Sequence, residues 1–176
     1  MSRRSHRLPR TGVIDPSGFQ SHNGSHYLLY KTQGLPSTIR IVKLTSNGLR
    51  VQRHARSRQL LSSRHIIENP VLLQKHGRFV LFTSEGFYGR CSYKTTWRRS
   101  SGLTHHWQRA RVHVLLHRSA LRVCGPGGAD VVMRDGAKPL LFFHGWTCWD
   151  TRRACPRRFH IDRPHGTRPQ RSLYAA

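Results

Sequence analysis

Acidic residues are scarce in this sequence. Its 176 residues include 7 Asp and Glu against 31 Lys and Arg, so the formal net charge is +24. Such a basic excess points first to a polyanionic partner, meaning nucleic acid or an anionic membrane surface. Arginine outnumbers lysine, however, and the densest basic runs lie at the two ends of the chain, with scattered arginines between them. We therefore favour a basic, solvated surface on a protein with another function, and keep nucleic-acid binding as an alternative.

Long apolar runs are also missing. No stretch approaches the roughly 20 apolar residues of a membrane-spanning helix, so we expect no membrane partner. The first ten residues are basic, but no apolar segment follows them, so no export signal is visible. The chain is either intracellular or a gene model without its true beginning, and its localisation stays open. The four cysteines are too few for a disulfide-scaffolded miniprotein.

No window of the sequence carries a convincing amphipathic helix of three turns. Short runs rich in β-branched and aromatic residues recur instead, separated by Asn-Gly, His-Gly, Pro-Gly and Asp-Gly pairs. The expected strands are Tyr27–Lys31, Ile39–Leu44, Ile66–Leu73, Phe79–Thr83, Ser92–Trp97, Asp130–Met133 and Leu140–His144. The segment Arg109–Leu116 comes nearest to a helix, but its apolar residues alternate and favour a further strand. The sequence therefore predicts an all-β fold.

Three segments repeat one template of a polar start, an apolar strand, a glycine turn, a second apolar strand and a glycine-containing exit. They cover residues 14–34, 67–86 and 127–146, and their turn glycines are Gly24, Gly77 and Gly136. Units of about 50 residues with several strands each have the size of β-propeller blades, whose equivalent positions converge on a central axis. Asp15 precedes its turn glycine by nine residues, and so does Glu68. We therefore expect these two carboxyls at one blade position, facing one site.

Two carboxyls across a site suggest general acid–base chemistry, and hydrolysis of a glycosidic bond is its simplest form. Structural roles remain open for both residues. Asp15 precedes a proline, and this pair is a common turn opener. Glu68 has no such turn role, because its neighbours predict a buried strand in which an unused carboxylate would be costly. We therefore favour a functional role for Glu68 and leave Asp15 between a cap and a functional residue.

Six motifs in this order resemble glycoside hydrolase family 43, the five-bladed β-propeller enzymes that include β-xylosidases, α-L-arabinofuranosidases and arabinanases. These motifs are GVIDPSGF (residues 12–19), YLLYKTQG (27–34), IIENPVLL (66–73), FVLFTSEGFYGRCSY (79–93), CGPGGADVV (124–132) and LLFFHGW (140–146). The resemblance implies a partial propeller of about three blades, with irregular Arg-rich termini. It also implies an inverting hydrolase that acts on xylan- or arabinan-derived sugars and binds oligo- or polysaccharides containing pentose.

By this resemblance, Glu68 is the general acid that protonates the departing oxygen. Asp15 is the second acidic residue, which raises the pKa of the acid and orients it. An inverting mechanism also needs a general base, which the family places in its first blade. The sequence matches the family from about the third blade onward, and none of its other acids takes the base position (Glu85, Asp130, Asp135, Asp150 and Asp162). The base is therefore missing from this chain, and a catalytically inactive relative that at most binds carbohydrate is the first alternative.

The resemblance bears on three further sites. Many relatives carry a histidine in the GPG motif that organises a central metal ion, but residues 128–130 are Gly, Ala and Asp here, so we expect neither a metal nor another cofactor. His144 follows the family motif, either as a substrate contact or as a strand-end histidine bonded to the backbone. Cys91 and Cys124 lie in family-like loops that meet at one rim, and they form a disulfide if the compartment is oxidising.

The expected organisation has three parts. Residues 1–11 are a basic, disordered segment, residues 12–146 are the partial glycosidase-type propeller, and residues 147–176 are a basic tail with one closing strand near residues 159–163. Three blades leave strand edges exposed, so we expect the isolated chain to associate with itself. Family members are often secreted, although this chain shows no signal peptide.

Overall fold

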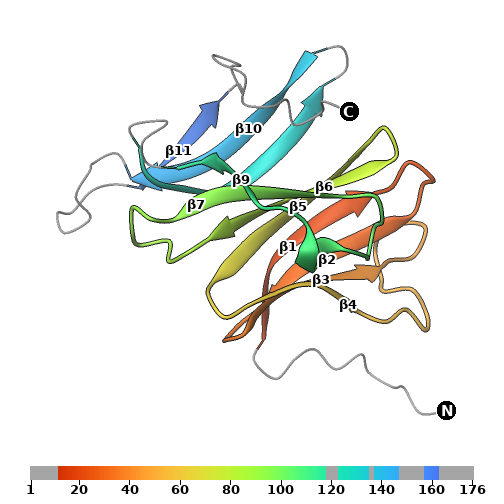
Figure 1. The fold of residues 1–176 in the computed structure, drawn as a ribbon. Helices are drawn as coiled ribbons and strands as arrows, with labels where there is room; N and C mark the ends of the chain where they lie inside the picture. The colour runs from red at the N-terminus through yellow and green to blue at the C-terminus, as the bar shows by residue number, and fades with distance from the viewer. Residues whose placement is uncertain (1–11, 118–122, 135–136, 147–156, 163–176) are drawn as a thin grey trace.

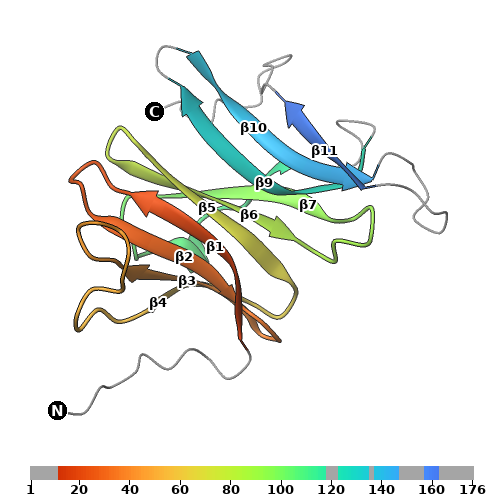
Figure 2. The same cartoon turned by 180° about the vertical axis from the view of Figure 1, so that it is seen from behind.

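The structure, a computed structural model, describes residues 12–117, 123–134, 137–146 and 157–162. Within these residues the chain forms strands, with one turn of 3-10 helix, η1 (Trp107–Arg109), and no α-helix. The strands make three antiparallel sheets that follow one another in sequence and fan out side by side (Figures 1 and 2). The predictions of an all-β fold and of about three propeller blades are confirmed.

Each sheet is formed by consecutive strands. The first sheet contains β1 (Val13–Gln20), β2 (His26–Thr32), β3 (Ser37–Lys43) and β4 (Arg58–Ser63). The second contains β5 (Ile67–Lys75), β6 (Arg78–Glu85), β7 (Lys94–Ser100) and β8 (His113–Leu116). The third contains β9 (Cys124–Arg134), β10 (Ala137–Trp146) and β11 (Arg157–Asp162), with β10 in the middle. Strand pairing between sequence neighbours is the arrangement that short turns favour.

Two strands, β1 and β4, are not among those expected from the apolar runs, although the repeat template places a strand before the turn at Gly24. Strand β1 contains a proline and a glycine, which are typical of turns. The proline is tolerated because β1 is the edge strand of its sheet. Strand β4 has an apolar centre of only two residues, Leu60 and Leu61, both of which are buried. Its flanking Arg58 and Gln59 are exposed, so no alternating pattern marks the strand in the sequence.

The alternation of side chains along β6 builds two separate cores. Phe79 and Leu81 point toward the first sheet, where Leu29 and Ile39 pack against them. Val80 and Phe82 point the other way and join a second core with residues of the third sheet, including Val131, Leu141 and Phe143. The second sheet is therefore covered on both faces, which explains why β6 is buried along nearly its whole length.

The segment between β7 and β8 crosses to the first sheet. Its Trp107, only 1% exposed, packs into the core between the first two sheets. The indole nitrogen of Trp107 donates to the carbonyl of Leu103, and the amide of Gln108 donates to the carbonyl of Ser62 on β4. This connection therefore fastens the outer edge of the first sheet to the second.

The proposed three-part organisation stays a prediction, because residues 1–11 and most of 147–176 lie outside the described residues. The strand expected near residues 159–163 corresponds to β11, which pairs with β10. The third turn glycine, Gly136, also lies outside the described residues. In the part of the chain that the structure describes, no helix is long and apolar enough to span a membrane.

Candidate active site

Two matching bulges, one in β1 and one in β5, bring the expected acids together. The register shifts between Ile14 and Ser17 in β1, and between Glu68 and Val71 in β5. In each bulge the residue before proline has a positive φ, 54° for Asp15 and 50° for Asn69. Aspartate and asparagine tolerate this left-handed conformation better than most residues, so the pairs Asp-Pro and Asn-Pro suit both bulges.

The bulges correct the expected alignment of the repeat by one residue. Ile14 pairs with Lys31, and Glu68 pairs with Ser84, so Glu68 is equivalent to Ile14 and Asp15 is equivalent to Asn69. The prediction that Asp15 and Glu68 occupy the same blade position was wrong. The reason is the turn length, since Asp15 lies nine residues before its turn glycine and Asn69 eight.

The side chains of Asp15 and Glu68 are nevertheless neighbours. The backbone N–H of Asn69 donates to Oδ2 of Asp15 at 3.1 Å, so the residue that follows Glu68 holds the aspartate. Burial raises the pKa of the Asp15 carboxyl, the hydrogen bond from Asn69 lowers it, the charge of Glu68 raises it, and the charge of Lys31 lowers it. The net effect is a pKa above the usual value, which makes Asp15 easier to protonate.

Glu68 is held by two donors, Lys31 of the first sheet and Tyr93 of the loop before β7. Lys31 on β2 donates from Nζ to Oε2 at 2.9 Å, and this ion pair is almost buried, with side chains 10% and 13% exposed. Tyr93 donates from its hydroxyl to Oε1 at 2.7 Å. Both contacts fix the direction in which the carboxyl group of Glu68 points. No sequence pattern had singled out Lys31 or Tyr93.

Tyr93 closes the network. Its hydroxyl accepts a bond from Nδ2 of Asn69 at 3.2 Å while it donates to Glu68. The side chain is almost fully buried, and this burial, more than any other cause, raises the pKa of Tyr93 well above its usual value. Tyr93 therefore remains a neutral donor at physiological pH and fixes the direction of the Glu68 carboxylate.

Comparison with family models identifies the family of the chain. The model of glycosyl hydrolases family 43 matches residues 3–164. The chain belongs to this family. Comparison with curated proteins gave no match.

Solved structures of family 43 type share the fold. A thermostable family-43 glycoside hydrolase superposes with a TM-score of 0.73 at 17% identity, covering 89% of this chain and 56% of the other. An endo-1,4-β-xylanase from Bacteroides thetaiotaomicron gives 0.71 at 18% identity, with 92% and 58% covered. The α-L-arabinanase of Cellvibrio cellulosa gives 0.68 at 19% identity, with 88% and 55% covered. The family 43 chain described here thus spans between half and three fifths of the length of these proteins.

His144 lies behind Tyr93 in the family 43 chain. The two rings are stacked, with centroids 6.4 Å apart and an angle of 10° between their planes. The glycines of β9 allow this packing, because a Cβ on Gly127 would lie 2.0 Å from the Tyr93 ring and one on Gly128 would lie 2.1 Å from Nε2 of His144. The structure therefore places His144 where it supports Tyr93, and its role as a substrate contact stays a prediction.

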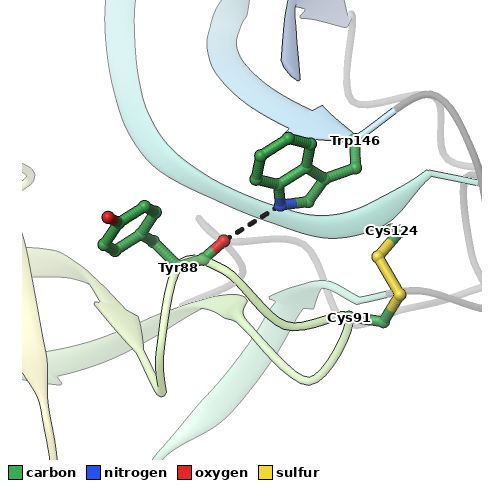
Figure 3. The surroundings of a disulfide bond; sticks show 4 residues. All are labelled: Tyr88, Cys91, Cys124 and Trp146. Carbon is green, nitrogen blue, oxygen red and sulfur yellow. Dashed lines mark hydrogen bonds between the residues drawn. A yellow bond between two sulfur atoms is a disulfide. The ribbon is translucent and has the colours of Figure 1, made fainter. Parts of the chain in front are cut away.

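A disulfide between Cys91 and Cys124 fastens the loop before Tyr93 to the third sheet (Figure 3). Beside it, the indole nitrogen of Trp146 donates to the backbone carbonyl of Tyr88 at 3.1 Å. The ring of Tyr88 is about half exposed, as is that of Phe87, so both rings are accessible at this rim. Trp97, in contrast, belongs to the second core.

The other described carboxylates are engaged away from the Asp15–Glu68 pair. Glu85 forms an ion pair with Arg98 at 2.9 Å and accepts a bond from Thr96. Asp130 is exposed and accepts a bond from the N–H of Val131. Neither of these two carboxylates belongs to the network of Asp15 and Glu68. Asp135, Asp150 and the side chain of Asp162 lie outside what the structure describes, and the absence of a general base from this chain stays a prediction.

The described residues do not fit a metal centre. They contain no group of three or more His, Cys, Asp or Glu side chains close enough to hold an ion. His144, which could act as a metal ligand, packs against Gly128 and the ring of Tyr93. We therefore derive no chemical step through a metal.

Proposed function

We propose that the chain is the acid-bearing part of a glycoside hydrolase that cleaves O-glycosidic bonds of xylan- or arabinan-derived sugars. The observation that carries the proposal is the closed network of Asp15, Asn69, Tyr93 and Glu68, built from two bulges and a tyrosine of the next loop. Such a network holds one carboxyl in a fixed direction, as a proton donor requires. The names of the similar solved structures, which are xylanases and arabinanases, support this substrate class.

In this mechanism Glu68 gives its proton to the departing glycosidic oxygen. Tyr93 directs the carboxyl, and Asp15 holds Asn69 and thereby the bulge that carries Glu68. Inversion requires a carboxylate on the opposite face of the sugar to activate water. That group has to come from outside the described residues.

The ion pair between Lys31 and Glu68 favours a second candidate function, carbohydrate binding without hydrolysis. The ammonium group of Lys31 lies 2.9 Å from Oε2 of Glu68 and so occupies one of the two oxygens that could carry the proton to be donated. Catalysis then requires that substrate displace the ammonium group of Lys31 before the proton transfer. If Lys31 stays in place, the chain binds sugar and does not cleave it.

Replacement of the acid separates the two candidates. If the purified chain hydrolyses aryl xylosides or aryl arabinofuranosides, Glu68→Gln should lower kcat by about 10²–10⁴-fold, because proton donation is lost while the hydrogen bond from Tyr93 is kept. The measurement is release of the aryl alcohol, with Glu85→Gln as the matched control at a carboxylate paired elsewhere.

Each outcome assigns a function. Activity that Glu68→Gln leaves intact would sink the acid role. Absence of hydrolysis together with calorimetric binding of xylotriose or arabinotriose would establish the binding function in its place. Absence of both would refute the carbohydrate proposal.

A further inference from the structure

A concave site lies at the opposite end of β2 from the ion pair of Lys31. It is a pocket of about 580 Å³ between the loop that follows β3 and the loop that follows β7. Tyr27 on β2 lines this pocket, four residues or roughly 13 Å along the strand from Lys31. Leu29 lies between them and is fully buried in the first core, so the two sites are separated by packed side chains.

The walls of this pocket are strongly basic. Six of its lining residues carry or can carry positive charge: Lys43, Arg53, His54, Arg56, Arg58 and His105. All six are exposed, and the lining includes no aspartate or glutamate. The two ion pairs among the described residues, Lys31–Glu68 and Arg98–Glu85, lie elsewhere. The charges of the pocket are therefore not balanced by acids from the described chain.

The loop after β3 is folded by its own backbone. Gln52 donates to the carbonyl of Lys43 at 3.0 Å, and Ala55 donates to the carbonyl of Gln52 at 3.0 Å. His54 completes the tight turn with a positive φ of 65°. This turn sets Arg53 and Arg56 on either side of one bend, close to Lys43 where β3 ends.

The facing wall is anchored in the core. The hydroxyl of Ser100 donates to the carbonyl of His105 at 2.8 Å and accepts a bond from the N–H of Gly102. Trp107 buries its ring two residues further on and bonds back to Leu103. Both walls are therefore preformed, and a ligand loses little affinity to ordering them.

The floor of the pocket is apolar. Tyr27, Ile41 and Leu103 line it, and the ring of Tyr27 is supported by Phe19 in a stacked contact with centroids 6.0 Å apart. An apolar floor under a ring of cations suits a ligand with one apolar face and anionic groups at its rim. The volume is in the range of sites for small ligands, and the arginines surround one hollow and do not follow a track as a nucleic-acid strand requires.

We propose that this pocket binds an oligosaccharide bearing carboxylate groups, as a site additional to the carboxyl network at Glu68. A uronate ring lies with its C–H face on Tyr27 and Leu103, and its carboxylate accepts paired hydrogen bonds from the arginine side chains. The inference that the ligand is a sugar rests on the proposed function. The inference that it is negatively charged rests on the lining of the pocket alone.

Calorimetry on the full chain with trigalacturonate at about 0.15 M salt tests the proposal. We expect binding that the double variant Arg53→Ser/Arg56→Ser weakens at least tenfold. The matched control is Arg78→Ser/Arg111→Ser, which removes the same charge from exposed positions that do not line the pocket. It should change the affinity less than twofold, because long-range attraction is screened by salt. Thermal melts of both variants, expected to match the parent, show that folding is intact.

Three outcomes would overturn the proposal: no binding of trigalacturonate, equal losses in both double variants, or tighter binding of a single-stranded oligonucleotide that the pocket variant alone abolishes. The last outcome would assign the pocket to nucleic acid. Binding of neutral xylotriose and arabinotriose is measured separately, since it depends on the Glu68 network. If the neutral sugars neither bind nor are cleaved, the proposed function is refuted, whereas the proposal for the basic pocket is unaffected.

Discussion

The ion pair between Lys31 and Glu68 joins two sheets at a place where neither side chain is well solvated. Removing only one partner leaves the other charge buried without compensation. We predict that Lys31→Met lowers the free energy of unfolding by about 3 kcal/mol, as measured by urea denaturation. The double variant Lys31→Met/Glu68→Gln should recover most of this loss, because the amide still accepts the bond from Tyr93. Additive losses in the two single variants and the double variant would contradict a direct interaction.

Asp15 makes stability depend on pH in a direction that follows from its burial. Its pKa in the folded protein lies above the usual aspartate value of 3.8, so ionisation of Asp15 opposes folding. The neutral carboxyl therefore contributes to the free energy of unfolding. This contribution is fully present below pH 3.8 and is lost as the pH rises through the raised pKa of Asp15. We predict that Asp15→Asn melts at a higher temperature than the parent at pH 7, since the amide oxygen still accepts from Asn69. This advantage should vanish at about pH 3.5, and an advantage of equal size at both pH values would contradict it.

At the residue scale, the sequence identified the two acids and missed what holds them. Asp15 and Glu68 stand out because acids are rare in the chain and both begin strand motifs. Lys31 carries no such signal, because it is one of 31 basic residues, and only the packing of β2 against β5 brings it to Glu68. A comparison of the two X-Pro pairs, Asp15-Pro16 and Asn69-Pro70, was the available clue to the correct alignment of the repeat.

At the scale of the elements, a disulfide holds the loop between β6 and β7 in place. The Cys91–Cys124 disulfide closes a loop of 33 residues in sequence and holds the segment that ends at Tyr93. Loop-closure entropy for this length predicts a contribution of about 3–4 kcal/mol. We predict that Cys91→Ser/Cys124→Ser loses this amount in urea unfolding under oxidising conditions. Under reducing conditions the parent and this variant should unfold alike, and a loss of the same size there would show that the stabilisation does not come from this bond.

The elements that the sequence predicted are those whose burial is simple. Strand β6 is buried on both faces, so it reads as a continuous apolar run, and β10 likewise contains one. Strand β4 is stabilised by tertiary contacts, since Ser62 binds Gln108 from the crossing segment 46 residues away. A contact of that range leaves no local pattern, so β4 could not be recognised from its own residues.

At the scale of the whole molecule, one face of the third sheet is not covered by another sheet among the described residues. Residues 131, 141 and 143 of this sheet point into the second core, so the pairing of Val132 with Leu140 lies on the other face. Val132 is 44% exposed and Leu140 is partly exposed, and in a closed propeller such a face packs against the next blade. The apolar surface favours association of two chains despite their like charge, which salt screens.

We predict that the isolated chain elutes as a dimer or larger species in size-exclusion chromatography with light scattering at 0.3 M salt. Val132→Lys should shift it toward monomer, because the new charge is costly to bury on that face. Val114→Lys is the matched control, since Val114 is similarly exposed, at 43%, but lies on β8 at the edge of the second sheet. If Val114→Lys dissociates the species and Val132→Lys does not, association runs through the strand edge of β8. A monomeric parent would show that the open face of the third sheet does not drive assembly.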